Sequence, residues 1–269
     1  MKKILLIGCG HMGEALLKSW INTKKYSFTI VDPYKFKTLK KKYKNSKIKI
    51  IKSILLLDKF EEFNFIILAT KPKDLNNALV ELSNIKINSN TSLISVIAGK
   101  KINNYKNKLK NIKNFFRVMP NMPAAIGQSM NCIVFNKTSS ISKRKEVIKL
   151  FSYSGKSIFL KNENQIDMAT AISGSGPGFV FNLIDAMEQG AIKLGFEKQI
   201  AKTLVYETFK GSINLLIHNN IRAKNLVKTV ATKGGTTEAG LKIMKKSRVH
   251  KIFADLINEA YKKAKDQGQ

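Results

Sequence analysis

Short, continuously apolar runs recur through the first 160 residues and alternate with lysine-rich segments of helical spacing. Runs that are apolar throughout, rather than at every second residue, are typical of strands buried on both faces of a parallel sheet. Helical segments between such strands make repeated βαβ units, which predict a doubly wound, Rossmann-type α/β fold. The predicted strands are residues 3–8, 28–32, 48–51, 63–70, 91–99, 114–119 and 132–135, and a helix is predicted at 141–152.

The remaining chain reads as successive helices between residues 164 and 266. Pro177 suits the first turn of a helix, where its missing N–H costs nothing, and Gly195 suits the closing position of the same helix. The sequence therefore predicts a Rossmann-type domain over residues 1–160 and an all-helical domain over residues 161–269. Helix breaks are predicted at 176–177, 195, 218–222 and 233–235.

The charge balance raises the question of a polyanionic partner. The chain has 48 Lys and Arg against 18 Asp and Glu, a net charge of +30. Such a field attracts polyanions, yet only four of the basic residues are arginine, the side chain that leads base and phosphate recognition. The lysines are spread along the chain with Asn and Ile. This pattern favours solvated surfaces over a specific nucleic-acid partner.

The cysteines, the histidines and the apolar runs exclude further classes of protein: disulfide-stabilised, metal-binding and membrane-anchored ones. Cys9 and Cys132 make neither a disulfide framework nor a metal-binding spacing, which fits a reducing cytosol. The three histidines are scattered, so we expect no metal site. No apolar run approaches the roughly 20 residues of a membrane span, and the run Ile4–Ile7 is shorter than the ~7–15 residues of a signal core. We expect a cytoplasmic protein without a membrane anchor.

Three glycines, Gly8, Gly10 and Gly13, follow the first apolar run and open the first helical segment. In this context the spacing is typical of dinucleotide binding: the first allows a tight turn, the second lets a pyrophosphate approach the backbone, and the third lets the helix pack on the strand. The anion then lies at a helix N-terminus. A chance glycine turn is the alternative. The predicted loop is Ile7, Gly8, Cys9, Gly10, His11, Met12 and Gly13.

The second predicted strand ends at Asp32, nineteen residues past Gly13. An acid there accepts hydrogen bonds from the adenosine ribose and repels a 2′-phosphate, which favours NAD. Lys35 and Lys37 follow at once and favour the opposite preference, unless both are surface lysines. From these residues alone the choice between NAD and NADP stays open, with Asp32 and Lys35 as the candidate cofactor ligands.

A second group of cofactor residues is predicted where the fourth run ends, at Ala69, Thr70, Lys71 and Pro72. Pro72 suits the first turn of a helix, and Lys71 falls at the carboxyl ends of the strands, where open α/β sheets bind ligands. One more surface lysine is the alternative reading of Lys71.

Three longer sequence stretches allow the chain to be compared with one particular enzyme family. "RVMPNMPA" begins at Arg117, "SGSGPGFVF" at Ser173 and "VATKGGTTEAGL" at Val230. Together with "GCGHMG", "ATKP" and "SVIAG" they stand in the order and at the spacings of the pyrroline-5-carboxylate reductases. The chain resembles that family over nearly its whole length.

The resemblance implies an NAD(P)H-dependent oxidoreductase acting on the CH–NH group, which reduces the cyclic imine L-1-pyrroline-5-carboxylate to L-proline in the last step of proline biosynthesis. It implies NADP(H) as the favoured cofactor, with NAD(H) as the alternative. It also implies a homodimer or larger homo-oligomer formed through the helical domain, which binds the small-molecule substrate.

The resemblance carries specific residues with it. Thr232, Gly235, Thr236 and Thr237 are expected to hold the substrate carboxylate with hydroxyl and N–H groups, and Thr237 is expected to face the ring nitrogen as the catalytic donor. Ser173 and Gly174 are expected to bring the backbone close to the substrate and the nicotinamide, although glycines before a helix also serve helix packing.

The chain departs from the family pattern at Lys233 and Ala223, where proline is common, and at Lys228, where an acid is usual. Replacing proline by Lys233 removes a fixed φ from the loop. One alternative is a hydroxyacid dehydrogenase, but Lys193 lacks the asparagine one turn later that such an enzyme needs. Further alternatives are a non-catalytic polyanion-binding Rossmann protein, a dinucleotide sensor and a pyridoxal-phosphate-binding structural protein. The intact glycine loops at both the cofactor end and the substrate end argue against them.

Overall fold

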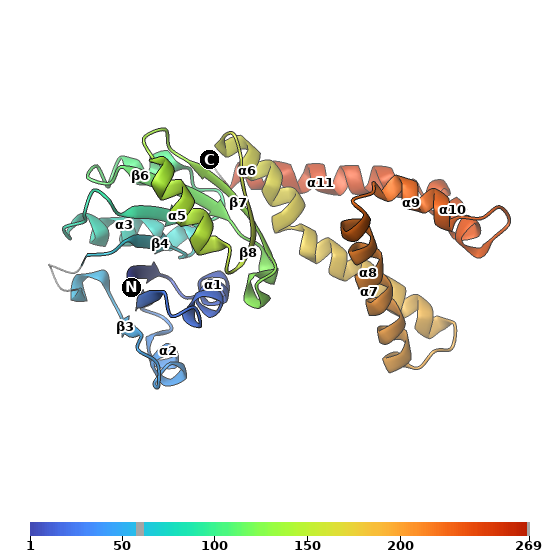
Figure 1. Cartoon of the computed structure of the whole chain (residues 1–269), viewed down its shortest axis with the longest axis horizontal. Coiled ribbons are helices and arrows are strands. Elements are labelled where there is room, and N and C mark those ends of the chain that lie inside the picture. The colour runs from blue at the N-terminus through green and yellow to red at the C-terminus, as the bar shows by residue number, and fades with distance from the viewer. Residues whose placement is uncertain (58–61, 268–269) are drawn as a thin grey trace. The chain divides into compact units, whose positions relative to one another are not determined.

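The computed structural model describes residues 1–57 and 62–267, which fall into two compact units. The first unit comprises Met1–Ser175 together with Ala260–Gln269, and the second comprises Gly176–Glu259. Figure 1 shows a sheet with surrounding helices in the first unit, whereas the second unit is built from helices throughout its length.

An eight-stranded sheet organises the first unit, in the order β3-β2-β1-β4-β5-β6-β7-β8. Neighbouring strands are parallel except β6 and β7, which are antiparallel. The strands are β1 (Lys2–Ile7), β2 (Tyr26–Val31), β3 (Lys49–Ile51), β4 (Phe65–Leu68), β5 (Ser92–Ser95), β6 (Asn114–Met119), β7 (Ser129–Phe135) and β8 (Gly155–Phe159).

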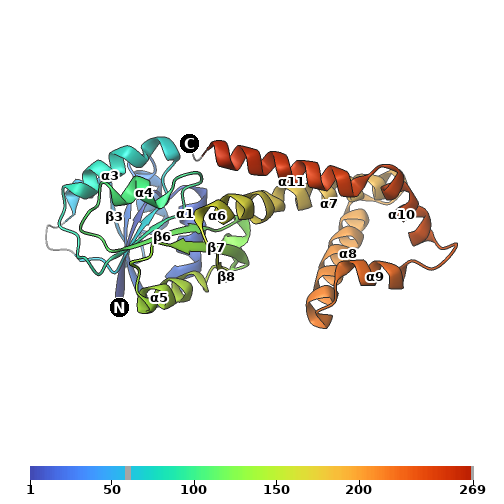
Figure 2. The ribbon, with the colours of Figure 1, turned by 90° about the horizontal axis from the view of Figure 1, so that it is seen from above.

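Helices cover both faces of this sheet, which confirms the predicted doubly wound fold. One core cluster joins the sheet to α1, α2 and α5, and the other joins it to α3, α4 and α6; Figure 2 shows α3 and α5 on opposite sides of the strands. The elements are α1 (His11–Ile21), α2 (Phe36–Lys42), α3 (Leu75–Ser83), α4 (Ile102–Lys106), α5 (Ile141–Phe151), α6 (Glu163–Ala169), the 3₁₀ turns η1 (Ile54–Leu56), η2 (Pro72–Asp74) and η3 (Met122–Ile126), and the π-helical turn η4 (Thr170–Gly174).

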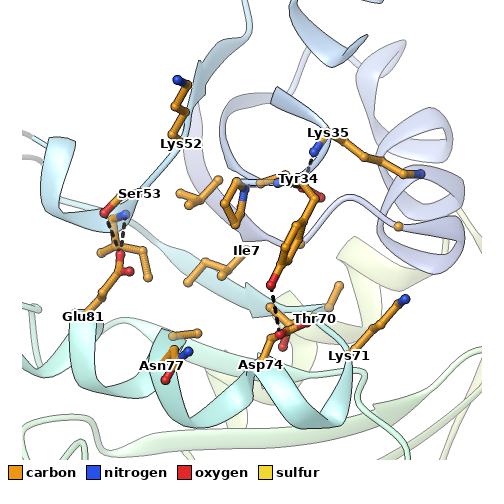
Figure 3. Close-up of a pocket in the computed structure, with 18 of the residues that line it drawn as sticks. Ile7, Tyr34, Lys35, Lys52, Ser53, Thr70, Lys71, Asp74, Asn77 and Glu81 are labelled. Atoms are coloured by element: carbon orange, nitrogen blue, oxygen red, sulfur yellow. Dashed lines mark hydrogen bonds between the residues drawn. The ribbon is translucent and has the colours of Figure 1, made fainter. Parts of the chain in front are cut away.

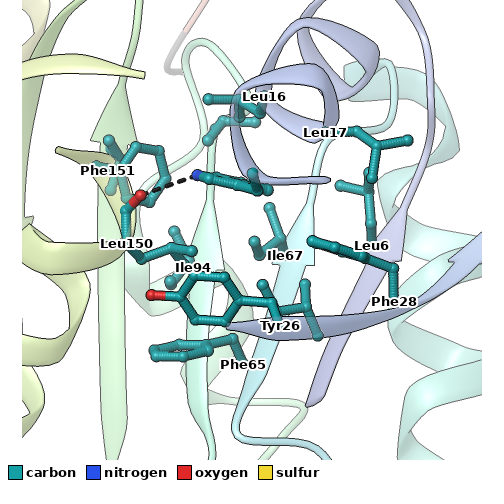
Figure 4. Close-up of a cluster of buried hydrophobic side chains, with 14 of the residues drawn as sticks. Leu6, Leu16, Leu17, Tyr26, Phe28, Phe65, Ile67, Ile94, Leu150 and Phe151 are labelled. Atoms are coloured by element: carbon teal, nitrogen blue, oxygen red, sulfur yellow. Dashed lines mark hydrogen bonds between the residues drawn. The ribbon is translucent and has the colours of Figure 1, made fainter. Parts of the chain in front are cut away.

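The single tryptophan anchors the helix that begins at the glycine loop. Trp20 of α1 is fully buried, its ring meets Phe151 edge to face at 5.7 Å, and its Nε1 donates to Leu150 O at 2.9 Å. Leu150 and Phe151 lie beside the side chains of the central strands in Figure 4. Buried aromatic packing of this kind holds α1, and with it the loop that precedes it, in one position against the sheet.

Two features of the sheet differ from the sequence prediction. Strand β8 was not predicted, because its sequence GKSIF lacks a continuous apolar run and lies at the sheet edge, where several of its side chains are exposed. Strand β7 is antiparallel to β6 although a parallel sheet was expected. The connection through η3 is shorter than the dozen or more residues that a parallel crossover requires.

The first unit extends to Ser175, beyond the predicted boundary at residue 160. The reason is that α6 packs on the sheet: Arg117 of β6 is buried, and its Nη2 donates to Asp167 Oδ1 of α6 at 2.8 Å. Arg117 Nη1 also lies 3.7 Å from Glu163 Oε1. The end of the chain belongs to this unit as well, because a Cβ on Gly99 would lie 2.2 Å from Gln267 O.

The second unit contains α7 (Gly176–Lys193), α8 (Lys198–Asn219), α9 (Ala223–Val230), α10 (Thr236–Lys246) and most of α11 (Val249–Asp266). These bounds confirm the predicted breaks, including Gly195, whose φ of +103° ends the α7 segment. A further break at Arg248, with φ +52°, was not predicted. All residues of this unit are described, and only Ala201 and Val205 among its apolar side chains are buried within one chain.

Within residues 1–57 and 62–267, no helix has the length and apolar character needed to span a bilayer. The same residues contain no cluster of three or more His, Cys, Asp or Glu side chains arranged to hold a metal ion.

Candidate functional site

The three glycines of the first loop differ in what surrounds them. Gly8 has φ +88°, and a Cβ there would lie 2.7 Å from Ala69 O. A Cβ on Gly13 would lie 2.3 Å from Gly8 O, so the helix α1 and the loop pack at the closest distance that glycine allows. Gly10 is the N-cap of α1, in extended conformation, and apart from its chain neighbours no described atom lies within 4 Å of the Cβ it lacks. Gly10 thus leaves open space at a helix N-terminus, where N–H groups attract an anion.

That open space belongs to a pocket of about 640 Å³ at the carboxyl ends of β1, β2 and β4. The volume falls in the usual range of ligand sites, roughly 300–1,000 Å³. Figure 3 shows its walls, with Tyr34 and Lys35 on one side and Thr70 and Lys71 on the other. The predicted cofactor residues that line the pocket are Ile7, Gly8, Gly10, Asp32, Lys35, Ala69, Thr70 and Lys71.

Five predicted cofactor residues do not line the pocket. Cys9 is fully buried in the core, Met12 packs against that core, and Gly13 lies behind Gly8. His11 begins α1 with its side chain exposed, and Pro72 begins η2. Burial raises the pKa of the Cys9 thiol to about 12, so this cysteine stays protonated and serves packing rather than chemistry.

Asp32 lines the pocket, but its carboxylate is directed at the chain's own backbone. Its Oδ2 accepts a hydrogen bond from Cys9 N at 2.8 Å, and its Oδ1 accepts from Tyr34 N at 3.0 Å and from Lys35 N at 2.8 Å. Only 5% of the residue is exposed. Asp32 therefore connects the glycine loop to the β2–α2 loop, a structural role that the sequence did not reveal.

Thr70 provides a test of whether the pocket suits a nucleotide. Its Oγ1 is buried at the pocket wall and has no hydrogen-bond partner among the described residues. A buried hydroxyl without a partner costs about 1–3 kcal/mol, so an oxygen-rich ligand in the pocket would stabilise this side chain. The unpartnered hydroxyl and the space at Gly10 both fit a dinucleotide.

Other pocket residues were not predicted from the sequence. Some are chain neighbours of Asp32 or Pro72, and others, such as Glu81, are brought to the pocket by long-range contacts. Tyr34 Oη donates to Asp74 Oδ1 at 3.3 Å across the pocket (Figure 3). Glu81 Oε2 of α3 accepts from Ser53 Oγ and from Ile54 N, both at 2.8 Å. No motif signals these pairs. The full set that was missed is Val31, Pro33, Tyr34, Lys52, Ser53, Ile54, Lys73, Asp74, Asn77, Ala78 and Glu81.

Ser173 and Gly174 lie in the π-helical turn η4 of the first unit. Asn121, from the "RVMPNMPA" stretch, donates through Nδ2 to Ser173 O at 2.9 Å and accepts at Oδ1 from Met130 N. Ser173 Oγ donates to Ala169 O at 2.9 Å. Single π turns inside helices are frequent at functional sites. The structure thus brings two of the sequence motifs together at one irregular turn.

The threonine loop of the second unit ends at Gly235, the N-cap of α10. Gly234 has φ +76° and donates its N–H to Glu238 Oε2 at 3.0 Å, and Gly235 N donates to Thr232 O at 3.0 Å. Thr236 and Thr237 are the first two residues of the helix, and both are exposed. Across the described residues, no hydrogen bond engages the hydroxyl of Thr232, Thr236 or Thr237.

Two family models match parts of the chain. One described as pyrroline-5-carboxylate reductase dimerisation matches residues 163–267, and one described as NADP oxidoreductase, coenzyme F420-dependent, matches residues 3–99. Pyrroline-5-carboxylate reductase 2 of Bacillus subtilis is 31% identical over 271 residues, which cover 98% of this chain and 94% of that protein. This chain belongs to the pyrroline-5-carboxylate reductase family.

More distant members support the same family and fold. Pyrroline-5-carboxylate reductase of Methanosarcina acetivorans is 27% identical, covering 100% of this chain and 98% of that protein. The crystal structure of Plasmodium falciparum pyrroline carboxylate reductase with NADP bound has a TM-score of 0.87 at 25% identity, covering 100% of this chain and 98% of that one. Prephenate dehydrogenase from A. aeolicus, with a TM-score of 0.56 at 16% identity, shares the fold alone.

These matches confirm the predicted family and fold class. The dimerisation model of the reductase family begins at residue 163, near the predicted boundary at 160–161, whereas the compact unit ends at Ser175. Helix α6 accounts for the difference, because it starts the matched segment but packs on the sheet. Lys233, which departs from the family pattern, is exposed in the threonine loop.

Asp32 yields a prediction that separates a structural role from a ribose contact. Asp32→Ser is expected to weaken the binding of NADPH and of NADH by a similar factor. It should also lower the free energy of unfolding by about 1–3 kcal/mol, because three backbone amides lose their hydrogen-bond acceptor. Titration with both dinucleotides and thermal unfolding measure the two effects. A selective gain for NADPH, with unchanged stability, would instead place the carboxylate at the ribose.

Proposed function

We propose that this chain reduces L-1-pyrroline-5-carboxylate to L-proline with NADPH, the last step of proline biosynthesis. The observation that carries the proposal is the match to a pyrroline-5-carboxylate reductase over 98% of the chain at 31% identity. The oxidoreductase class and the NADP(H) cofactor predicted from the sequence are confirmed at the level of the family.

The cofactor half of the reaction is assigned to the first unit. Gly8, Gly10 and the N-terminus of α1 would hold the pyrophosphate, and Thr70 and Lys71 would bind further oxygens of the dinucleotide. Bound NADPH supplies the hydride that reduces the imine carbon. The protein's contribution is to fix the dinucleotide, which the close packing of Gly8 against Ala69 supports.

The substrate half is assigned to the threonine loop and to Ser173 and Gly174. The hydroxyls of Thr232 and Thr236, with the Gly235 N-cap, would bind the substrate carboxylate, and Thr237 would donate a hydrogen bond to the ring nitrogen. Glu238 accepts a hydrogen bond from Gly234 N and forms an ion pair with Lys242, so its role is to stabilise the loop and not to bind the substrate. An imine that binds in its protonated form needs no strong acid from the protein, which agrees with a loop that offers hydroxyl groups.

The second unit carries the family's dimerisation region, and we propose a homodimer or larger homo-oligomer. A unit with so few buried apolar side chains cannot supply its own core, and apolar surface of this extent marks an interface. The exposed apolar side chains include Phe181, Leu183, Met187, Phe196, Ile200, Leu204, Ile213, Leu215, Ile217, Val227, Ile243 and Ile252.

The charge of +30 does not require a nucleic-acid partner, and we propose a cytoplasmic enzyme without one. Two of the four arginines are engaged inside the first unit: Arg117 pairs with Asp167, and Arg144 lies 3.9 Å from the ring centroid of Phe135. This leaves lysine, a compact point charge, as the main exposed cation, which supports passive salt-dependent attraction rather than base recognition.

Oxidation of NADPH on addition of pyrroline-5-carboxylate tests the proposed function. We expect turnover with the cyclic imine and proline as the product, and no turnover with 2-keto acids, the substrates that a hydroxyacid dehydrogenase would reduce. Consumption of NADPH with a 2-keto acid and none with pyrroline-5-carboxylate would contradict the proposal. Absence of both activities in folded, NADPH-binding protein would favour a dinucleotide sensor.

A further inference from the structure

The carboxylates that line the cofactor pocket have hydrogen-bond partners within the chain, whereas the lysines that line it form no ion pair among the described residues. Its carboxylates accept hydrogen bonds from the chain itself: Asp32 from three backbone amides, Asp74 from Tyr34 Oη, and Glu81 from Ser53 and Ile54. The pocket is also lined by Lys35, Lys52, Lys71 and Lys73. In the part of the chain that the structure describes, no ion pair joins these ammonium groups to a carboxylate.

Two of these lysines flank the end of β2. Val31 pairs in register with Ile51 of β3, and Asp32 N donates to Ile51 O at 3.2 Å, so Lys52 continues β3 next to Asp32. Lys35 lies in the loop that follows Asp32, and its backbone N–H donates a hydrogen bond to Asp32 Oδ1. In a dinucleotide-binding fold the end of this strand is the position of the adenosine ribose and its 2′ substituent.

Two lysine side chains, Lys40 and Lys52, contact the ring of Phe36 near the end of β2. Lys52 Nζ lies 5.3 Å from its centroid and Lys40 Nζ lies 5.0 Å from it. Both cations are attracted by the ring, but they repel one another, and an anion bound in the pocket beside Lys52 offsets that repulsion. Phe36 directly follows Lys35 and begins α2, so its contact with Lys52 connects the end of β3 to the start of α2 beside the pocket. Of the two lysines at this ring, Lys52 lines the pocket.

We infer that Lys35 and Lys52 bind the 2′-phosphate of NADPH, and that Asp32 positions the two loops instead of reading the ribose. The inference rests on the proposed function and adds to it the residues that select NADPH over NADH. Lys71 is assigned elsewhere, because it lies on the opposite wall of the pocket with Asp74 (Figure 3). A phosphate that meets two lysines gains charge-assisted hydrogen bonds that a 2′-hydroxyl does not make.

Adenosine 2′,5′-bisphosphate and 5′-AMP test the inference without turnover, because they differ only in the 2′-phosphate. Calorimetric titration of the wild type is expected to favour the bisphosphate on the order of 10²-fold, since each charged contact contributes about tenfold. Lys35→Ser and Lys52→Ser should each lower this ratio about 10-fold, and the double variant should bring it near one. Lys37→Ser is the matched control: it removes the same charge nearby but is exposed and does not line the pocket.

A double variant with the wild-type ratio would overturn the inference, and so would a Lys37→Ser protein that loses as much as Lys35→Ser, because the effect would then come from the general positive field. Asp32→Ser should leave the ratio unchanged. The proposed function is measured separately, by turnover of the wild type. A wild type that reduces pyrroline-5-carboxylate but binds both nucleotides equally would refute this inference alone.

Discussion

Gly10→Val is expected to abolish dinucleotide binding and to leave the protein folded. Apart from the chain neighbours, no described atom lies within 4 Å of the Cβ position, and the extended backbone of φ −68° and ψ −161° is open to any L-residue. The fold therefore tolerates the side chain, which instead fills the place of the pyrophosphate. Losing two charged hydrogen bonds to the backbone, each of about 1.5–3 kcal/mol, corresponds to roughly 10²–10⁴-fold in affinity. NADPH titration and thermal unfolding of one preparation measure both effects.

Gly13→Val provides the contrast in the same loop. Its Cβ would lie 2.3 Å from Gly8 O, a backbone atom that cannot move aside, so this variant should lose at least about 1–3 kcal/mol of stability through overpacking. The two variants distinguish Gly10, which leaves space for a ligand, from Gly13, which allows helix α1 to pack closely on the loop. Normal NADPH affinity in folded Gly10→Val protein would remove the nucleotide assignment of this loop.

The central strands were predictable because their environment leaves a local signature. Strands β1, β2, β4, β5 and β6 have helices on both faces, so almost all of their side chains are buried. Their sequences are mostly apolar on both faces, with a few buried polar residues such as Ser95 and Arg117. Strand β8 carries no such signature, since it lies at the edge and exists through its pairing with β7. The break at Arg248 was also hidden, because no glycine or proline marks it.

The candidate site was predictable to the extent that glycine and motif spacing report backbone geometry. Gly8, Gly10 and Thr70 fell at the pocket because they follow strands of a recognisable sheet. The sequence could not show which partner Asp32 takes, since an acid at the end of β2 suits a ribose and a backbone amide equally. Tyr34 and Glu81 depend on contacts between segments far apart in the chain, and no local pattern records such contacts.

Thr237→Ala is expected to lower kcat by a factor on the order of 10–10³ and to change KM less, the upper end being that of an oxyanion-hole donor. The hydroxyl of Thr237 is exposed at the second residue of α10, and the described residues give it no hydrogen-bond partner. A donor aimed at the ring nitrogen matters most as the charge on that nitrogen changes, so its loss affects the transition state more than the bound substrate. Thr236→Ala should act mainly on KM if that residue holds the carboxylate.

The competing explanation is that Thr237 stabilises the start of α10. A capping hydroxyl contributes about 0.5–2 kcal/mol, but the N-cap here is Gly235, which makes no side-chain cap. Removing the hydroxyl of Thr237 should therefore leave the melting temperature unchanged, and Thr237→Ser, which keeps the donor, should retain most of kcat. Steady-state kinetics and thermal unfolding on one preparation decide the question. A Thr237→Ala enzyme with a lowered melting temperature and unchanged kcat would end the catalytic assignment, because the hydroxyl would then contribute to the helix and not to the transition state.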